Sequence, residues 1–315
     1  MTTTPLATLP PMTSLDAPAD ADAAFRQTQE AVNRTLSLQL FFIASCSKSG
    51  STWLQHLLDG HPQICCHGEA FFPTFLRPLL DAAAQRYNGL HKCQHTRNRH
   101  QRPGDLTPQD VRFLYRNAVG LIMARWVGDD QVRAVGDKTP ENAISAVSLL
   151  EDFPRAKLIH LIRDGRDVCV SGWFHNLREK GPAFQQQFPT LAHYIPLMAG
   201  QKWVPYIQAA RRAQGRWPDR YHEIKYEDLH TQPRQALRSL LRFLEVDDSD
   251  AAIDVCEQAG QFRLLSGGRQ RGQEQPDAFY RKGVAGDWKN HFDETCTRIF
   301  MQHAGDLLRS LGYEA

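Results

Sequence analysis

The sequence predicts an α/β fold of three layers, in which a central, mostly parallel sheet is flanked by helices. Short apolar runs with β-character alternate along the chain with segments in which apolar residues recur at helical spacing, and this alternation is typical of parallel sheets covered on both faces. Polar turns follow two of the predicted strands directly. Such sheets bind ligands at the carboxyl ends of their strands, so these turns mark the candidate site. The length of 315 residues suits one large domain.

The amino-terminal part of the chain is expected to contain an arm, a strand and a helix. Residues 1–36 are expected to form a flexible arm with a short helix over 25–36. The apolar run 38–44 has the length and composition of a buried strand. A serine-rich turn over 45–50 separates this strand from a helix over 51–58, which carries leucines on one face.

The remaining predicted elements continue the same alternation. Apolar spacing and the positions of proline and glycine set their limits. They are a helix over 143–152, a strand over 157–162, a helix over 168–174, a strand over 222–226, a helix beginning at Pro233 and a last helix over 295–311.

Composition excludes several classes of protein. The formal net charge of +2 argues against a dedicated nucleic-acid binder. No run approaches the roughly 20 apolar residues of a membrane helix, and no basic start followed by an apolar stretch indicates a secretory signal. The seven cysteines are scattered without a C-x-x-C pair, which favours a reduced, cytoplasmic setting.

The strongest local signal is the strand, turn and helix over 40–58. Small residues in the turn allow backbone N–H groups to surround an anion, and Lys48 adds a formal charge beside them. An ordinary tight turn between a strand and a helix is the alternative. The phosphate loop of nucleotide kinases reads G-x-x-x-x-G-K-S/T. Here Lys48 precedes Gly50, which weighs against ATP as the ligand.

Four segments together resemble the motifs of sulfotransferases that use 3′-phosphoadenosine 5′-phosphosulfate (PAPS). Residues 47–54, Ser-Lys-Ser-Gly-Ser-Thr-Trp-Leu, are similar to the family's 5′-phosphosulfate loop. Residues 161–171, from Leu-Ile-Arg-Asp-Gly-Arg to Ser, resemble its 3′-phosphate element, while Lys225 to Leu229 match its Y-E-D-L signature. Residues 279–292 contain Arg-Lys-Gly followed by Gly-Asp-Trp-Lys-Asn, as in the cytosolic branch. The ordered set implies a P-loop-like fold and a sulfotransferase domain over 37–315.

The resemblance implies a role for each motif residue. PAPS carries about four negative charges, which the cations of these motifs would oppose. The product of direct in-line transfer would be adenosine 3′,5′-bisphosphate (PAP). The expected donor-binding residues are Lys48, Ser49, Gly50, Ser51 and Thr52 at the 5′ end, Trp53 and Tyr226 at the adenine, and Arg163, Ser171, Arg281, Lys282 and Gly283 at the 3′-phosphate.

The catalytic residues are expected to follow another branch of the family. Many cytosolic members use a His after a Lys-Thr pair, whereas here Pro140 follows Lys138 and Thr139. Tyrosylprotein and heparan-type members instead use a Glu shortly after the first helix, and Glu69 stands at that position. We therefore expect Glu69 to be the base and Lys138, with Lys48, to stabilise the leaving group.

Alternatives to this catalytic assignment stay open. Glu69 would otherwise pair with an arginine or cap a helix. His67 and His175 are the reserve candidates for the base. The nearby Phe71 and Phe72 are expected to exclude water from the carboxyl group.

The acceptor side is expected to lie beneath loops at about 71–105 and 176–205. The first of them contains the basic segment 91–102, which is expected to be a lid or an anion contact; its spacing fits no standard zinc site, and no metal is expected. A small molecule, a glycan or a peptide remains open as acceptor, as does a homodimer. The alternatives to a sulfotransferase are a nucleotide-dependent kinase of related fold and a non-catalytic nucleotide-binding protein.

Overall fold

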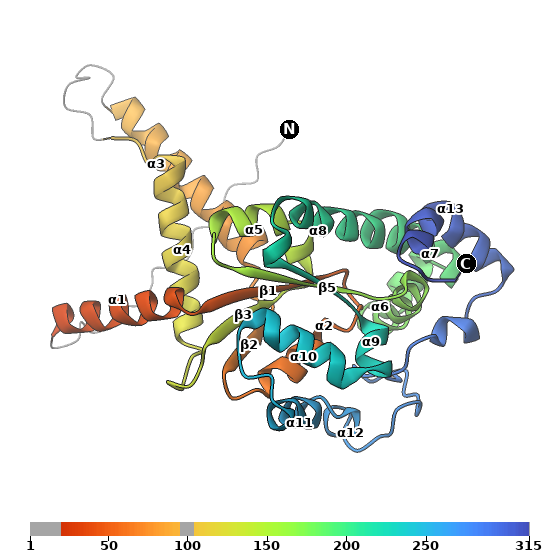
Figure 1. Ribbon diagram of the computed structural model, residues 1–315. Coiled ribbons are helices and arrows are strands. Elements are labelled where there is room, and N and C mark those ends of the chain that lie inside the picture. The colour runs from red at the N-terminus through yellow and green to blue at the C-terminus, as the bar shows by residue number, and fades with distance from the viewer. Residues whose placement is uncertain (1–19, 95–103, 315) are drawn as a thin grey trace.

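The computed structural model describes residues 20–94 and 104–314, and its centre is a five-stranded sheet. The strand order is β2-β3-β1-β4-β5, and every neighbouring pair is parallel. The carboxyl ends of all five strands therefore lie at one edge of the sheet (Figure 1). The strands are β1 (Gln39–Ser45), β2 (Ile64–Gly68), β3 (Ala134–Lys138), β4 (Lys157–Ile162) and β5 (Tyr221–Lys225).

Helices cover both faces of this sheet, which confirms the predicted layer architecture (Figure 1). The side chains on the two faces form separate apolar clusters. The first face is covered by α2 (Ser51–Asp59), α9 (Tyr226–Thr231), α10 (Pro233–Leu244) and α11 (Asp250–Ala259). The second is covered by α4 (Pro108–Ala124), α5 (Ala146–Asp152) and α8 (Val204–Arg216).

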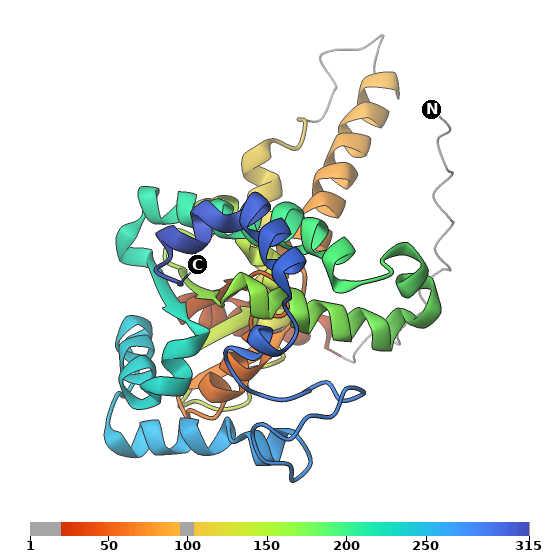
Figure 2. The same cartoon turned by 90° about the vertical axis from the view of Figure 1, so that its right-hand side faces the viewer.

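A third apolar cluster lies beyond the carboxyl ends of the central strands. It is formed by α6 (Gly165–Gln187), α7 (Leu191–Ile195), the π-helical segment η4 (Pro196–Trp203) and α13 (Glu294–Ser310). Between α12 (Phe262–Leu265) and α13 the chain is largely irregular and contains one 3-10 turn, η6 (Asp287–Asn290). Figure 2 shows this blue segment crossing the molecule from α12 to α13.

The arm predicted over residues 1–36 is in part a packed helix. α1 (Ala21–Ser37) begins before the predicted helix over 25–36 and is capped by the Asp20 carboxylate, which accepts from the Ala23 N–H. It packs against α4, where a side chain on Gly120 would approach the Leu36 Cγ to 2.9 Å. Residues 1–19 of the predicted arm lie outside the described residues.

The acceptor-side loops expected at 71–105 and 176–205 are mostly helical, so this expectation was wrong. The first contains the π-helical turn η1 (Phe72–Leu76) and α3 (Arg77–Gln94), which projects from the body beside α4 (Figure 1). The second is occupied by the end of α6, by α7 and by η4. Gly181, with φ 53°, and Pro182 interrupt the helical pattern inside α6, and this break hides the helix in the sequence. Most of the predicted basic lid, residues 95–102, lies outside the described residues.

The sequence did not predict β2 and β3. β3 reads Ala-Val-Gly-Asp-Lys, and its glycine and charged residues are uncommon in strands. The buried Asp137 is satisfied by the N–H of Ala70 at 3.0 Å and the side-chain amide of Asn142 at 3.0 Å.

No helix among residues 20–94 and 104–314 is long and apolar enough to cross a membrane.

Candidate functional site

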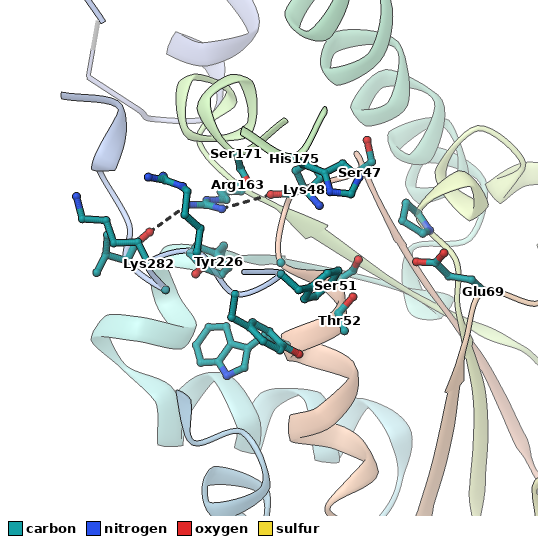
Figure 3. Close-up of a pocket in the computed structure, with 18 of the residues that line it drawn as sticks. Ser47, Lys48, Ser51, Thr52, Glu69, Arg163, Ser171, His175, Tyr226 and Lys282 are labelled. Atoms are coloured by element: carbon teal, nitrogen blue, oxygen red, sulfur yellow. Dashed lines mark hydrogen bonds between the residues drawn. The ribbon is translucent and has the colours of Figure 1, made fainter. Parts of the chain in front are cut away.

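A cavity of about 340 Å³ opens at the carboxyl edge of the sheet. Six separate segments line it, namely the turn after β1, the residues after β2, the residues after β3, the segment from the end of β4 into α6, the start of α9 and the segment before η6. Figure 3 shows Lys282 and Glu69 at opposite ends, with Arg163 and Lys48 between them. The lining residues are Ser47, Lys48, Gly50, Ser51, Thr52, Trp53, Glu69, Phe71, Pro140, Glu141, Arg163, Ser171, His175, Tyr226, Phe279, Tyr280, Arg281, Lys282, Gly283 and Val284.

The turn after β1 has the backbone geometry of an anion-binding loop. Lys48 and Gly50 both have left-handed conformations, with φ of 72° and 93°. A side chain at Gly50 would meet the Tyr226 ring at 2.5 Å, so the close approach of turn and ring requires glycine. α2 begins at Ser51, and the N–H groups of Ser51 and Thr52 have no hydrogen-bond partner among the described residues, whereas that of Trp53 donates to the Gly50 carbonyl oxygen at 3.0 Å. They and the helix dipole face the cavity as donors for an anion.

Lys48 carries the cation of this loop in a half-buried position. Its ammonium lies 5.3 Å from the centroid of the Phe279 ring. Burial, and to a smaller extent the nearby Arg178, lowers the pKa of Lys48 to about 8. A bound anion would oppose both effects and favour the charged ammonium.

Arg163 stands at the end of β4 and is fixed from several sides. Its guanidinium donates to the Lys48 and Val284 carbonyl oxygens at 3.3 and 3.0 Å, and its centre lies 4.4 Å from the centroid of the Tyr226 ring. It also pairs with the buried Asp167 at 3.3 Å. The Nε of Arg163 is buried and has no hydrogen-bond partner among the residues that the structure describes. This donor is therefore left for a ligand.

The irregular segment before η6 brings two further cations to the cavity. The buried Asp287 accepts from Arg281, and from the Lys282 ammonium at 2.6 Å. These donors depress the pKa of the Asp287 carboxyl far below its usual range, although burial alone would raise it. Asp167 accepts from the N–H groups of Gly286 and Trp288 at 2.7 and 2.8 Å, which ties the segment to α6. Two buried carboxylates thus hold these cations in place.

Trp53 lies between this cavity and a second one of about 460 Å³. Its indole N–H donates to the Gly260 carbonyl oxygen at 2.8 Å, and the residue is only 8% exposed. The guanidinium of Arg271 lies 4.6 Å from the centroid of the Trp53 ring and donates to the Gly283 carbonyl oxygen at 3.0 Å. His230 also packs on Trp53, with ring centroids 4.7 Å apart.

Glu69 and Lys138 form an ion pair at the opposite end of the cavity. β2 and β3 are in register with Gly68 opposite Lys138, and the Glu69 N–H donates to the Lys138 carbonyl oxygen at 3.1 Å. The Lys138 ammonium donates to Glu69 Oε1 at 2.7 Å; its side chain is buried, whereas that of Glu69 is half-exposed. Glu69 adopts a left-handed conformation, with φ 58°. One carboxylate oxygen is thereby held, and the other has no hydrogen-bond partner in the part of the chain that the structure describes.

The two phenylalanines beside Glu69 differ in position. Phe71 lines the cavity and stacks on Phe75, with ring centroids 4.7 Å apart. Phe72 is fully buried in the apolar cluster of the second sheet face. Only Phe71 therefore stands where it can exclude water from the cavity.

The reserve histidines are far from equivalent. His67 stacks on Trp126, with ring centroids 5.1 Å apart, and does not line the cavity. His175 does line it, one helical turn after Ser171 (Figure 3). Burial, followed by the charges of Lys48 and Arg178, lowers the pKa of His175 to about 4. It is therefore neutral at physiological pH.

The structure places nearly all the predicted site residues around one cavity. There are two exceptions. Ser49 is buried within the turn, and Lys138 lies outside the cavity but donates to the cavity residue Glu69. Sequence reasoning missed the anchor Asp167 and the Trp53 neighbour Arg271. Asp167 follows Arg163 by four residues, the spacing of a local ion pair, and that signal was available. Arg271 carries no such signal.

The residues at the Arg163 end of the cavity fit a phosphorylated ligand. They include the Arg163 Nε, which has no partner among the described residues, and the Ser171 hydroxyl. The Arg281 and Lys282 side chains, which pair with carboxylates, complete the set. Planar guanidinium groups match phosphate geometry. Among the described residues, no group of three His, Cys, Asp or Glu side chains is arranged to hold a metal ion.

Comparisons with known proteins give a consistent family. Residues 41–250 match the family model described as sulfotransferase family. Human sulfotransferase 1E1 is 28% identical over 160 residues, which are 47% of this chain and 53% of that protein. The match thus spans about half the length of that relative. Chicken protein-tyrosine sulfotransferase 2 is 23% identical over 278 residues, 88% of this chain and 70% of that protein.

A solved structure shares the fold. The crystal structure of mouse sulfotransferase SULT7A1 complexed with PAP superposes with a TM-score of 0.55 at 17% identity, covering 89% of each chain. Its likeness agrees with the parallel sheet and its two helical layers.

Proposed function

The chain belongs to the sulfotransferase family, and we propose on that premise that it transfers a sulfuryl group from PAPS to an acceptor hydroxyl or amine and releases PAP. One observation carries the proposal: a single cavity holds two groups of cations and, next to one of them, a carboxylate. Lys48 forms the first group, and Arg163, Arg281 and Lys282 form the second. This arrangement suits a donor that carries anionic groups at both ends.

The donor would lie along the cavity with its ends fixed separately. The 5′-phosphosulfate would meet Lys48 and the loop donors of Gly50, Ser51 and Thr52. Ser49 would support the turn instead, because its N–H donates to the Cys46 carbonyl oxygen at 3.2 Å. The 3′-phosphate would meet Arg163, Ser171 and the Arg281–Gly283 segment, whose guanidinium groups suit a terminal phosphate. Trp53 and Tyr226 would hold the adenine between the two ends. The similar structure of mouse sulfotransferase SULT7A1 complexed with PAP supports this choice of donor.

Glu69 would act as the general base. Sulfuryl transfer needs a group that takes the acceptor proton and a cation near the departing oxygen. The Glu69 carboxylate keeps one oxygen free, and Lys138 fixes the other. Lys48 would stabilise the negative charge that develops on the departing phosphate oxygen, with Lys138 orienting the base beside it. The acceptor proton would pass to Glu69 as the new oxygen–sulfur or nitrogen–sulfur bond forms.

The acceptor would enter beneath the helices that replace the predicted loops, η1 with α3 and α6 with α7. Small molecules, glycans and peptides all remain candidates, because a fold does not define its substrate. One similar protein, chicken protein-tyrosine sulfotransferase 2, is named for a protein acceptor. We further propose a cytoplasmic setting. The described cysteines are free and buried, as in a reduced protein. They are Cys46, Cys65, Cys66, Cys169, Cys256 and Cys296.

Nucleotide affinity tests the donor assignment. The Lys48→Ala and Arg163→Ala proteins should each lose about 2–5 kcal/mol of PAP binding free energy, because each would remove a desolvated partner of the anion. Isothermal titration calorimetry gives the affinities, with Lys202→Ala, an exposed cation outside the cavity, as the control. Wild-type affinity in both cavity variants contradicts the proposal.

Turnover tests the base. Glu69→Gln keeps the size of the side chain and an oxygen that can accept from Lys138, but removes the carboxylate. It should bind PAP normally and lose at least about a hundredfold in turnover with labelled PAPS and a cell extract. Turnover close to that of the wild type contradicts the assignment of Glu69.

The sulfotransferase and kinase assignments predict opposite orders for the thermal shifts caused by PAP and ATP. A ligand at a hundred times its dissociation constant adds about 2.7 kcal/mol of stability, which is easily visible in a melting curve. PAP should therefore raise the melting temperature more than ATP does at equal concentration. A larger shift with ATP favours a kinase, and loss of sulfate transfer across a broad acceptor panel favours a non-catalytic binding protein.

A further inference from the structure

His175 occupies a specific place in the cavity that the catalytic assignment above leaves unused. It lies on α6 beside Lys48, as Figure 3 shows. Its Nδ1 is 2.9 Å from Arg178 Nη2. Arg178 is itself fixed, because it donates to the Glu179 carboxylate at 2.8 Å and to the Ala278 carbonyl oxygen at 3.0 Å.

The contact with Arg178 determines which nitrogen of His175 carries the proton. A guanidinium has only N–H donors, so His175 Nδ1 must supply the lone pair in this hydrogen bond. A neutral imidazole with an unprotonated Nδ1 carries its proton on Nε2. No hydrogen bond from Nε2 to a described residue accompanies this contact.

The charges around His175 keep the ring neutral. Lys48 faces it from the turn after β1, and Arg178 and Lys180 act on it from α6; Glu179 is the carboxylate that opposes them. Three cations against one anion disfavour an imidazolium. His175 therefore presents an N–H group to the cavity and has no free lone pair with which to act as a base.

We propose that His175 donates a hydrogen bond from Nε2 to an oxygen of the sulfuryl group during transfer. The inference rests on the proposed function, which places the 5′-phosphosulfate at Lys48. The sulfuryl oxygens accept hydrogen bonds and cannot donate them, so an N–H beside Lys48 complements them. His175 transfers no proton in this step; it stabilises charge on the group as it moves from the phosphate oxygen to the acceptor.

Arg178 is a positioning residue in this arrangement. It does not line the cavity, and it acts by fixing the tautomer and the orientation of His175. Arg178→Lys keeps a cationic donor for Nδ1, whereas Arg178→Met removes it. The lysine variant should therefore retain the behaviour of the wild type better than the methionine variant.

Affinities for PAPS and PAP separate this role from a general structural one. Only PAPS carries the sulfuryl group, so His175→Ala should bind PAPS about tenfold more weakly and PAP within twofold of the wild type. His175→Gln places an amide N–H near the position of Nε2 and should keep most of the PAPS affinity. Calorimetry with both nucleotides gives these ratios without requiring the acceptor. Equal losses for both nucleotides, or no loss in either, overturn the proposal.

Nitrogen NMR tests the tautomer without any nucleotide. His175 in the wild-type protein should show a protonated Nε2 and an unprotonated Nδ1 at pH 7, and Arg178→Met should abolish this fixed state. A protonated Nδ1 in the wild type overturns the proposal even if every nucleotide binds. If the expected tautomer is present but neither PAPS nor PAP binds, the proposed function fails instead, and the donor role fails with it. Melting curves of each variant show whether it folds, and Arg178→Met serves if His175→Ala does not fold.

Discussion

The two cationic ends of the cavity are built in different ways. At the Lys48 end, a strand, a turn and a helix of the sheet scaffold supply backbone donors and one half-buried ammonium. At the Arg163 end, two of the three cations, Arg281 and Lys282, come from an irregular segment, and side chains hold that segment in place. The first end is shaped by backbone conformation, and the second by buried carboxylates.

This difference affects how each end meets an anion. Lys48 has no ion pair at hydrogen-bond distance among the described residues, so its charge is available as it stands. At the other end, Asp167, Asp287 and Glu274 already pair with the cations. A phosphate bound there would find oriented hydrogen-bond donors but little net positive charge. It would also compete with these carboxylates for the cations. We therefore expect variants of the two ends to fail in different ways.

The largest effect should come from Asp167→Ala. This carboxylate is buried and holds Arg163 and two N–H groups of the irregular segment, so its loss leaves a charge and two donors without partners. The free energy of unfolding should fall by about 3–5 kcal/mol. Urea denaturation measures it, and hydrogen exchange should rise first in residues 284–290. Asp293→Ala, which removes an exposed helix cap, should cost only about 1 kcal/mol. Equal losses in the two variants would show that side chains do not hold this end.

Alanine at two glycines compares the rigidity of the two ends directly. Gly50 and Gly283 both have positive φ, and a side chain would meet a ring at 2.5 Å from Tyr226 or at 2.3 Å from Phe262. The turn around Gly50 belongs to the sheet scaffold, whereas the segment around Gly283 can shift. Gly50→Ala should therefore lose about 1–3 kcal/mol of stability, and more than Gly283→Ala. Thermal melts of both variants give the order, and the reverse order contradicts the comparison.

The pH dependence of PAP binding should come from the Lys48 end. The charged ammonium binds the anion, and its pKa in the free protein is about 8, whereas arginines stay charged at all accessible pH values. A bound anion raises this pKa, so affinity is retained below pH 8 and is lost above it, by up to about tenfold per pH unit. Calorimetry between pH 7 and 10 measures the slope. Lys48→Arg is the matched variant and should remove the slope; a slope that persists would assign the titration to another group.

The smallest effect should come from Arg271→Ala. Trp53 is almost fully buried, and the guanidinium over its ring must leave before an adenine can stack there. Removing that guanidinium should increase PAP affinity about twofold to fivefold, the usual strength of an exposed cation–π contact. Quenching of tryptophan fluorescence by PAP gives the affinity, and the exposed Arg298→Ala is the control. A loss of affinity would mean that Arg271 contacts the nucleotide.

The sequence was sufficient for the elements that have strong local patterns. β1 and β4 are apolar runs, and α10 has leucines at helical spacing, so each was predicted close to its observed limits. β5 reads Tyr-His-Glu-Ile-Lys and was predicted one residue late, over 222–226. β2 and β3 were missed because their cysteine, histidine, glycine and charged residues are stabilised by neighbours that are distant in the chain. The acceptor-side segment 176–205 was expected to be a loop because Gly181 and Pro182 interrupt a helix that tertiary packing maintains.

The candidate site was predictable through motifs, but its internal contacts were not. The motif residues come together because their segments all end at one edge of the sheet. The roles of Asp167 and Arg271 depend on contacts between segments that are more than a hundred residues apart along the chain. Asp167 accepts from the Gly286 N–H, and Arg271 lies over the Trp53 ring. The tautomer of His175 likewise depends on the direction of one guanidinium, which residue spacing alone does not define.

The register of β2 on β3 has a consequence for changes in chain length. Gly68 lies opposite Lys138, and Glu69 is the next residue after that pair. Deleting a single residue from β2 would move the carboxylate to the other side of the pleat, away from its lysine. We therefore expect the short stretch from Ile64 to Gly68 to tolerate substitutions far better than insertions or deletions, and a library of one-residue substitutions and indels scored for survival would reveal that asymmetry.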